Sequence, residues 1–228
     1  MNRWNYVLLF AFVFSLHAGA QRFRAGVIAG AVASDLDGAD FKDHDDDFHK
    51  AGFTGGGFVN AKLSDKNSVQ FEILCTQKGS YQPGDTIDPS YYLLKLDYIE
   101  VPVIYRHQLH IQVHSRSTDR FAFEFGPSFG ALFHIHQEGL LMDSGGSYTS
   151  SYFDNSTFKR TELALNAGIC FSITKNFLFD VRYQNSVIPV TKHALPFNTF
   201  FWKSFTKGDN MVFSFTLRYM FLNEKKSE

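Results

Sequence analysis

The chain has 228 residues, enough for one domain of ordinary size, and its formal net charge is -1 at pH 7. This balance gives no basic field and argues against nucleic-acid binding. Aromatic residues make up 17% of the chain, with 26 Phe against 2 Trp, yet the mean hydropathy of -0.16 is too polar for a bundle of membrane helices. The combination favours strands that keep one face away from water.

Residues 1–20 predict a signal peptide. Arg3 precedes an apolar run from Tyr6 to Leu16, and Ala18-Gly19-Ala20 supplies a small-residue cleavage site. The run is short for a spanning helix, and no later segment is apolar over about 20 residues. We expect cleavage near Ala20, a barrel domain over 21–223 and a charged tail over 224–228.

Segments of alternating apolar and polar residues follow along the rest of the chain. Strict alternation predicts strands with one apolar face. In chain order the segments are 22–34, 50–63, 68–79, 93–107, 121–133, 160–174, 176–186 and 210–221. Most are long enough to cross a bilayer when tilted, which takes roughly 9–11 residues.

The segment FAFEFGPSFGALF, residues 121–133, shows the alternation most clearly. Phe121, Phe123 and Phe125 share one side, and Glu124 lies on the other. In a soluble sheet the aromatic side faces a core, whereas in a transmembrane barrel it faces lipid. The alternation by itself does not distinguish the two.

Connection lengths favour the membrane barrel. Long connections follow the first, third, fifth and seventh segments, while tight turns, SDKN and TKN, follow the second and sixth. Outer-membrane barrels have short periplasmic turns and long outer loops. Residues 108–119 depart from this pattern, and we interpret them as a hairpin extension of both neighbouring strands. The predicted fold is a single antiparallel up-and-down transmembrane β-barrel of about eight strands, which is an all-β fold.

A narrow barrel interior requires balanced charge, because an unpaired ion there is costly. Acids and arginines on the polar faces nearly cancel, and arginine is the better bidentate partner. The predicted interior ion-pair network contains Arg24, Glu72, Glu100, Arg106, Glu124, Glu162, Asp180, Arg182 and Arg218. The predicted lipid-facing side chains are Phe121, Phe123, Phe125, Phe213 and Phe215.

Three short patterns occur in the predicted strands: L.Y.E.P at Leu96, Tyr98, Glu100 and Pro102, GP..G at Gly126, Pro127 and Gly130, and D.RY at Asp180, Arg182 and Tyr183. In these patterns the sequence resembles the PorT-like outer-membrane β-barrel family of Bacteroidetes. The resemblance covers nearly all of the mature chain and implies the fold and an outer-membrane location. The protein that gives the family its name belongs to a secretion and gliding machinery, but the resemblance is weak for activity.

Candidate chemical sites are few. Cys75 and Cys170 lie on opposite strand faces, which predicts two free thiols. The acidic stretch 35–50 contains Asp43, Asp45, Asp46, Asp47, His44 and His49. It is interpreted as a solvated loop tip, with cation binding left open. The spacing of His107, His110 and His114 does not favour a metal site, and we expect no metal and no cofactor.

Three functions are weighed. The first is a non-enzymatic integral barrel with a structural, surface-interaction or transport/secretion-accessory role, since about eight strands leave an interior filled by side chains. The second is an outer-membrane lipid-modifying enzyme that uses the rim residues His134, His136, Glu138, Ser144 and Ser147. The third is a secreted soluble ligand-binding barrel with its Phe face turned inward. Expected partners of the first are outer-membrane lipid and lipopolysaccharide, the barrel assembly machinery and envelope proteins, with no nucleic acid.

Overall fold

The computed structural model describes residues 23–36, 48–83, 91–113, 116–142, 148–149, 157–192 and 208–221. The strands are β1 (Phe23–Leu36), β2 (Lys50–Lys62), β3 (Asn67–Gln82), β4 (Tyr91–Val113), β5 (Arg116–Met142), β6 (Tyr148–Thr149), β7 (Thr161–Ser172), β8 (Phe177–Ser186) and β9 (Asn210–Met220). The predicted signal peptide and C-terminal tail lie outside the described residues. In the described part of the chain, no helix has the length and apolar character needed to cross a membrane.

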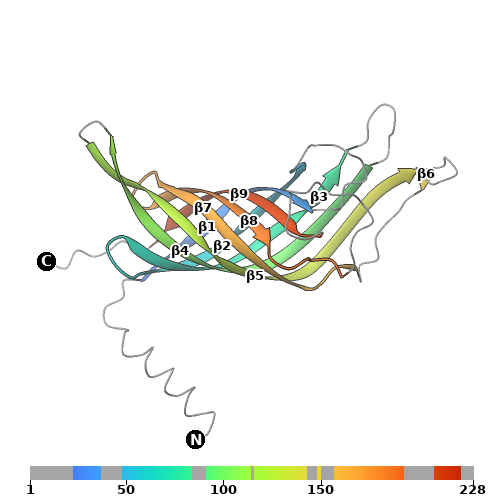
Figure 1. Ribbon diagram of the computed structural model, residues 1–228, viewed down its shortest axis with the longest axis horizontal. Coiled ribbons are helices and arrows are strands. Elements are labelled where there is room, and N and C mark those ends of the chain that lie inside the picture. The colour runs from blue at the N-terminus through green and yellow to red at the C-terminus, as the bar shows by residue number, and fades with distance from the viewer. Residues whose placement is uncertain are drawn as a thin grey trace, which may run out of the picture.

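Eight of these strands form a closed antiparallel ring. The order is β4-β3-β2-β1-β9-β8-β7-β5, and pairing between β4 and β5 closes it. Figure 1 shows the strands running obliquely along the barrel, and the two-residue β6 pairs with the far end of β5. The predicted all-β up-and-down barrel is confirmed.

The two ends of the barrel differ in their connections. One end, called here the turn end, has the short connections 63–66, 114–115 and 173–176 and also the start of β1 and the end of β9. The opposite end, called the loop end, has the connections that follow β1, β3, β5 and β8. This segregation of connection lengths is the one that the sequence predicts.

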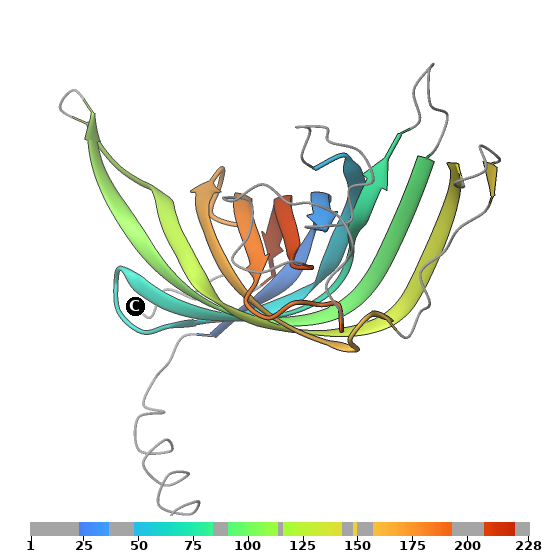
Figure 2. The ribbon, with the colours of Figure 1, turned by 45° about the vertical axis from the view of Figure 1, so that its right-hand side comes forward.

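Three strands are longer than predicted. At the turn end, β4 continues to Val113 and β5 begins at Arg116, so residues 108–113 and 116–119 form the expected hairpin extension. Figure 2 shows this β4–β5 hairpin projecting beyond the rest of the barrel. At the loop end, β3, β4 and β5 also run past their predicted ends. A register shift between Asp97 and Tyr98 marks the start of the extended part of the β4–β5 pair.

The barrel has charged side chains inside and apolar side chains outside. Glu124 and Arg218 are 1% and 0% exposed, whereas Phe125 and Phe215, on the same two strands, are 49% and 46% exposed. Phe123 and Phe213 also lie on the outer surface, and Phe121 packs against Phe171 there with ring centroids 5.0 Å apart. A soluble barrel would have the opposite arrangement. The alternative of a soluble ligand-binding barrel is therefore wrong.

The two cysteines lie on opposite faces of the barrel wall. Cys75 is exposed on the outside of β3, and Cys170 is buried on the inside of β7. Both are free thiols, as the sequence predicts.

Candidate functional site

Six charged side chains meet in the barrel interior near the turn end, and we call them the central arginine cluster. They are Glu72, Arg106, Glu124, Asp180, Arg182 and Arg218, and every one is buried or nearly so. They come from β3, β4, β5, β8 and β9, so the cluster joins strands around the ring. Strand alternation directs each of them inward.

Glu124 is the hub of this cluster. Arg106 places Nε 2.8 Å from Glu124 Oε1, and Arg182 places Nη2 3.0 Å from Oε2. Arg218 donates from Nη2 to both carboxylate oxygens, at 2.9 and 2.8 Å, and its Nε lies 2.7 Å from Asp180 Oδ2. One carboxylate is thus shared by three guanidinium groups, the geometry for which arginine is suited.

Arg182 also binds Glu72 on the opposite wall. Its Nη1 and Nη2 each lie 2.9 Å from one oxygen of that carboxylate, and Gln70 donates to Glu72 Oε1 at 2.6 Å. In the ring, β8 and β3 are diametrically opposed, so this pair crosses the lumen. Arg106 donates to Cys170 Sγ at 2.8 Å, which gives that thiol a polar neighbour.

The central arginine cluster is electrically balanced, with three guanidinium groups and three carboxylates. Glu124, Cys170 and Asp180 bring potential metal-ligand atoms within 4.8 Å of one another. The adjacent arginines already neutralise both carboxylates, however, and a cation placed there would lie next to positive charge. We therefore interpret these residues as part of an ion-pair network and not as a metal centre.

A second polar layer lies closer to the loop end and is centred on Lys78. Lys78 Nζ lies 2.7 Å from Glu100 Oε1 and 2.9 Å from Glu162 Oε2. Gln184 donates to Glu100 at 2.9 Å, and Ser186 donates to Glu162. All these side chains are buried, so the layer joins β3, β4, β7 and β8 across the interior.

The loop end is filled by an apolar cluster. The residues are Leu36, Tyr92, Leu94, Leu96, Tyr98, Leu132, Phe158 and Val190. Phe158 pairs with Thr191 in an isolated bridge, and the backbone N–H of Lys159 donates to the carbonyl of Val190 at 2.7 Å. The segments on either side of β7 and β8 thus meet and place Phe158 and Val190 over the mouth of the barrel.

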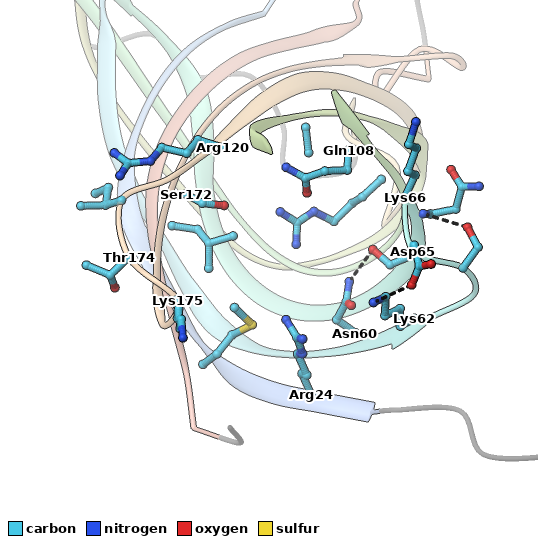
Figure 3. Close-up of a pocket in the computed structure, with 18 residues that line it drawn as sticks. Arg24, Asn60, Lys62, Asp65, Lys66, Gln108, Arg120, Ser172, Thr174 and Lys175 are labelled. Carbon is cyan, nitrogen blue, oxygen red and sulfur yellow. Dashed lines mark hydrogen bonds and ion pairs between the residues drawn. The ribbon is translucent and has the colours of Figure 1, made fainter. Parts of the chain in front are cut away.

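The turn end, in contrast, contains an open cavity of about 910 Å³. Figure 3 shows Arg24, Asn60 and Gln108 extending into it from the barrel wall. Arg106 belongs to the central arginine cluster and also lines this cavity, so the cluster lies directly beneath it.

The structure brings together most of the predicted network, but it divides the residues into two layers. Glu72, Arg106, Glu124, Asp180, Arg182 and Arg218 lie in the central arginine cluster. Glu100 and Glu162 lie in the second layer, and Arg24 lies apart from both, on the cavity wall. The expectation that the interior bases are all arginine is wrong, because Lys78 neutralises the second layer. Lys78 lies on the same polar face of the segment 68–79 as Glu72, and this position could have identified it as an interior cation.

The rim histidines point away from the lumen. Beyond Phe133 the β4–β5 pairing shifts by one residue, so that His134 pairs with Asp97 and His136 with Lys95 on the outer surface. His134 Nδ1 lies 2.8 Å from Asp97 Oδ2, and Gln77 donates to Asp97 Oδ1 at 3.1 Å. Among the described residues, no hydroxyl or thiol is bonded to His134. Ser144 and Ser147 lie outside the described residues.

The remaining histidine candidates do not converge. His107 bonds Asn67 Oδ1 at 2.7 Å, and His110 bonds Asp119 Oδ1 at 2.6 Å, each through Nδ1. His114 and the aspartates of 43–47 lie outside the described residues, so cation binding by the acidic stretch stays an open expectation.

Most of the motif residues that carry the family resemblance face the lumen, whereas Pro127 and Tyr183 lie on the outer surface. Glu100 belongs to the Lys78 layer, and Asp180 and Arg182 belong to the central arginine cluster. A Cβ at Gly130 would lie 3.1 Å from the Tyr98 ring and 3.3 Å from the Glu162 side chain. Glycine at this position leaves room for both.

A model of the outer membrane protein beta-barrel domain matches residues 16–192. Among solved structures, Ail, the attachment invasion locus protein of Yersinia pestis, has 14% identity and a TM-score of 0.45 over 87% of this chain and 98% of its own. Neisserial surface protein A has 12% identity and a TM-score of 0.42 over 89% of this chain and 99% of its own. The N-terminal β-barrel domain of Pseudomonas aeruginosa OprF has 10% identity and a TM-score of 0.34 over 88% of this chain and 100% of its own. No curated protein sequence is significantly similar to this chain.

Proposed function

Because this chain belongs to the outer membrane protein beta-barrel domain family, we propose that it is a closed, non-enzymatic outer-membrane barrel that acts by interaction. Its role is that of an anchor or accessory for an envelope assembly, such as a transport or secretion machine. The resemblance to PorT-like proteins supports this choice. The turn end is then the periplasmic end, because short turns face the periplasm in such barrels.

The filled interior is the observation that carries the proposal. The central arginine cluster, the Lys78 layer and the apolar cluster follow one another along the lumen. Between the two polar layers, a cavity lined by Thr54, Thr76 and Glu100 has a volume of only about 20 Å³. That volume holds about one water molecule. A barrel filled in this way is unsuited to diffusion of solutes.

Both ends have elements that extend beyond the barrel wall. The β4–β5 hairpin projects at the turn end, and β3, β4 and β5 extend together at the loop end (Figure 2). Rigid strands that leave the membrane provide edges and faces for protein contacts. These elements support an interaction role better than a transport role.

Planar-bilayer recording tests the closed state. The refolded protein should give little or no steady conductance, because its lumen is occupied by buried side chains. The matched variant lacks the β4–β5 hairpin beyond His107 and Phe121 and should be equally silent, since the hairpin lies outside the filled lumen. A stable channel of nanometre size in the wild-type protein would contradict the proposal.

A lipid-modifying enzyme is the second candidate, and one observation favours it. His134 and Asp97 form a hydrogen-bonded pair on the outer surface at the loop end, where a general base would meet a lipid headgroup. Incubation of the protein with phospholipid or lipopolysaccharide vesicles, followed by mass spectrometry of the lipids, tests it. Lipid products that disappear in His134→Ala would favour the enzyme over the anchor.

The first 20 residues belong to this proposal as a signal peptide that is removed on export. N-terminal sequencing of the protein from outer membranes should begin near Gln21. A mature chain that begins at Met1 would contradict it.

A further inference from the structure

The cavity at the turn end has walls of predominantly positive charge. Six cationic side chains line it, and Asp65 is the one acidic residue among the lining residues. The cationic residues are Arg24, Lys62, Lys66, Arg106, Arg120 and Lys175. Asp65 lies 3.3 Å from Lys62 and therefore offsets one of these charges locally.

Three of the cations have no ionic partner within the described ranges. Lys66 in the 63–66 turn, Arg120 on β5 and Lys175 in the 173–176 turn make no side-chain hydrogen bond or ion pair there. Figure 3 shows Lys66 on one side of the cavity and Arg120 with Lys175 on the other. Positive side chains thus lie on both sides of the opening.

The charged layer beneath the cavity does not cancel this field. Arg106 is matched by Glu124, and the central arginine cluster contains equal numbers of guanidinium and carboxylate groups. The central arginine cluster therefore does not neutralise the excess positive charge at the opening of the cavity. A concave wall of one sign concentrates its potential and raises the local concentration of oppositely charged solutes.

The cavity also offers neutral hydrogen-bond donors between the charges. The hydroxyl groups of Ser172 and Thr174 lie on its walls. The side-chain amides of Asn60 and Gln108 lie there too, but they already donate to Ser68 and to the backbone carbonyls of Asp119 and Phe121. Asn60 and Gln108 extend toward its centre in Figure 3. Phosphate and carboxylate oxygens are acceptors, so donors interspersed with cations suit them.

We propose that this cavity is a binding site for a small soluble polyanion with several phosphate or carboxylate groups. The ligand enters from the turn end, and its charged groups contact Lys66 on one side and Arg120 with Lys175 on the other. The volume of about 910 Å³ lies in the range of small-molecule sites, which is roughly 300–1,000 Å³. This site goes beyond the proposed anchor function and does not depend on it.

Titration calorimetry of the full-length protein in uncharged detergent tests the site. The probes are inorganic tripolyphosphate and citrate, with sucrose as a neutral control. Both anions are expected to bind saturably, and sucrose is not. Tighter binding of tripolyphosphate would assign phosphate groups to the ligand, and tighter binding of citrate would assign carboxylates. Added salt should weaken binding, since the Debye length falls to about 3 Å at 1 M.

A matched pair of variants separates the site from general attraction. Arg120→Gln/Lys175→Gln removes one arginine and one lysine from the cavity, and Lys95→Gln/Arg160→Gln removes the same residue types near the loop end. The first should bind the anions about tenfold more weakly, and the second should stay within about twofold of wild type.

Two outcomes would overturn the proposal. One is the absence of saturable binding to the wild-type protein up to about 1 mM anion, the weak end of specific affinity. The other is equal weakening in both double variants, which would indicate attraction to overall charge. The mobility of each variant on unheated gels establishes that it is folded, so that misfolding is not mistaken for loss of anion binding.

Discussion

Arg182 on β8 reaches across the lumen to Glu72 on β3, with both terminal nitrogens 2.9 Å from the carboxylate oxygens. The two residues are far apart in the sequence and lie on opposite walls of the ring. Their contact ties the barrel across its diameter, in addition to the hydrogen bonds that tie neighbouring strands. Filling the lumen and bracing the wall are therefore done by the same side chains.

The hub position of Glu124 predicts a large cost for its removal. Glu124→Leu leaves Arg106, Arg182 and Arg218 with too few carboxylates in a buried space. Breaking a buried pair in this way costs on the order of 3–5 kcal/mol in the free energy of unfolding. Phe123→Leu, the neighbouring outward position, keeps an apolar group outside and should cost much less. Reversible unfolding in lipid vesicles measures both, and a near-neutral Glu124→Leu would contradict the buried network.

The second layer makes an independent prediction for Lys78. Lys78→Met leaves Glu100 and Glu162 as two buried carboxylates without their cation, at a cost of about 3–5 kcal/mol in unfolding free energy. Adding Glu100→Gln and Glu162→Gln to this variant should recover most of the loss, because no unpaired ion then remains. The same unfolding assay measures the rescue. A triple variant as unstable as Lys78→Met would show that shape, and not charge, sets the role of Lys78.

The alternation of residue types, together with the segregation of connection lengths, was enough to predict the barrel. Phe123, Phe125, Phe213 and Phe215 face outward while Glu124 faces inward. Period-two alternation fixes side-chain direction once one face is known. The balance of interior charges could also be anticipated, because it follows from composition and alternation without knowledge of register.

Pairing across the ring could not be predicted. Lys78 and Glu162 are 84 residues apart, and their contact depends on the register of strands that are not neighbours. The outward direction of the His134 side chain could not be predicted either. Strict alternation from Glu124 would turn it inward, but the irregularity near Phe133 reverses the faces beyond that point. The continuation of β5 beyond residue 133 at the loop end was missed because pairing continues past the apolar segment.

Topology predicts different accessibility at the two ends. Asp65, whose side chain is fully exposed, lies in a turn at the turn end, and Arg160 is exposed beside the start of β7 at the loop end. In a Cys75→Ala background, Arg160→Cys should react with a membrane-impermeant maleimide on intact cells, and Asp65→Cys should react only after permeabilisation. The buried Cys170 provides an internal unreactive thiol. Reversed reactivity would place the turn end outside the cell.

The outer surface of β5 predicts where the membrane ends. Phe125 and Phe129 lie in the exposed apolar stretch, whereas His136 lies beyond the irregularity near Phe133, among polar neighbours that include Lys95. Phe125→Arg should lower the free energy of unfolding by about 2–4 kcal/mol, the cost of a charge near the bilayer midplane. His136→Arg on the same strand should change it by about 0.5 kcal/mol or less, as at an exposed site.

Unfolding of both variants in lipid vesicles measures the contrast, with Phe125→Leu as the apolar control. Phe125→Leu keeps the surface compatible with lipid and should lie closer to wild type than Phe125→Arg does. Equal costs for Phe125→Arg and His136→Arg would mean that lipid extends over both positions or over neither. If the costs differ as predicted, the apolar region of the membrane ends between Phe133 and the His134–Asp97 pair. That pair is then the outermost contact of the barrel wall with lipid headgroups.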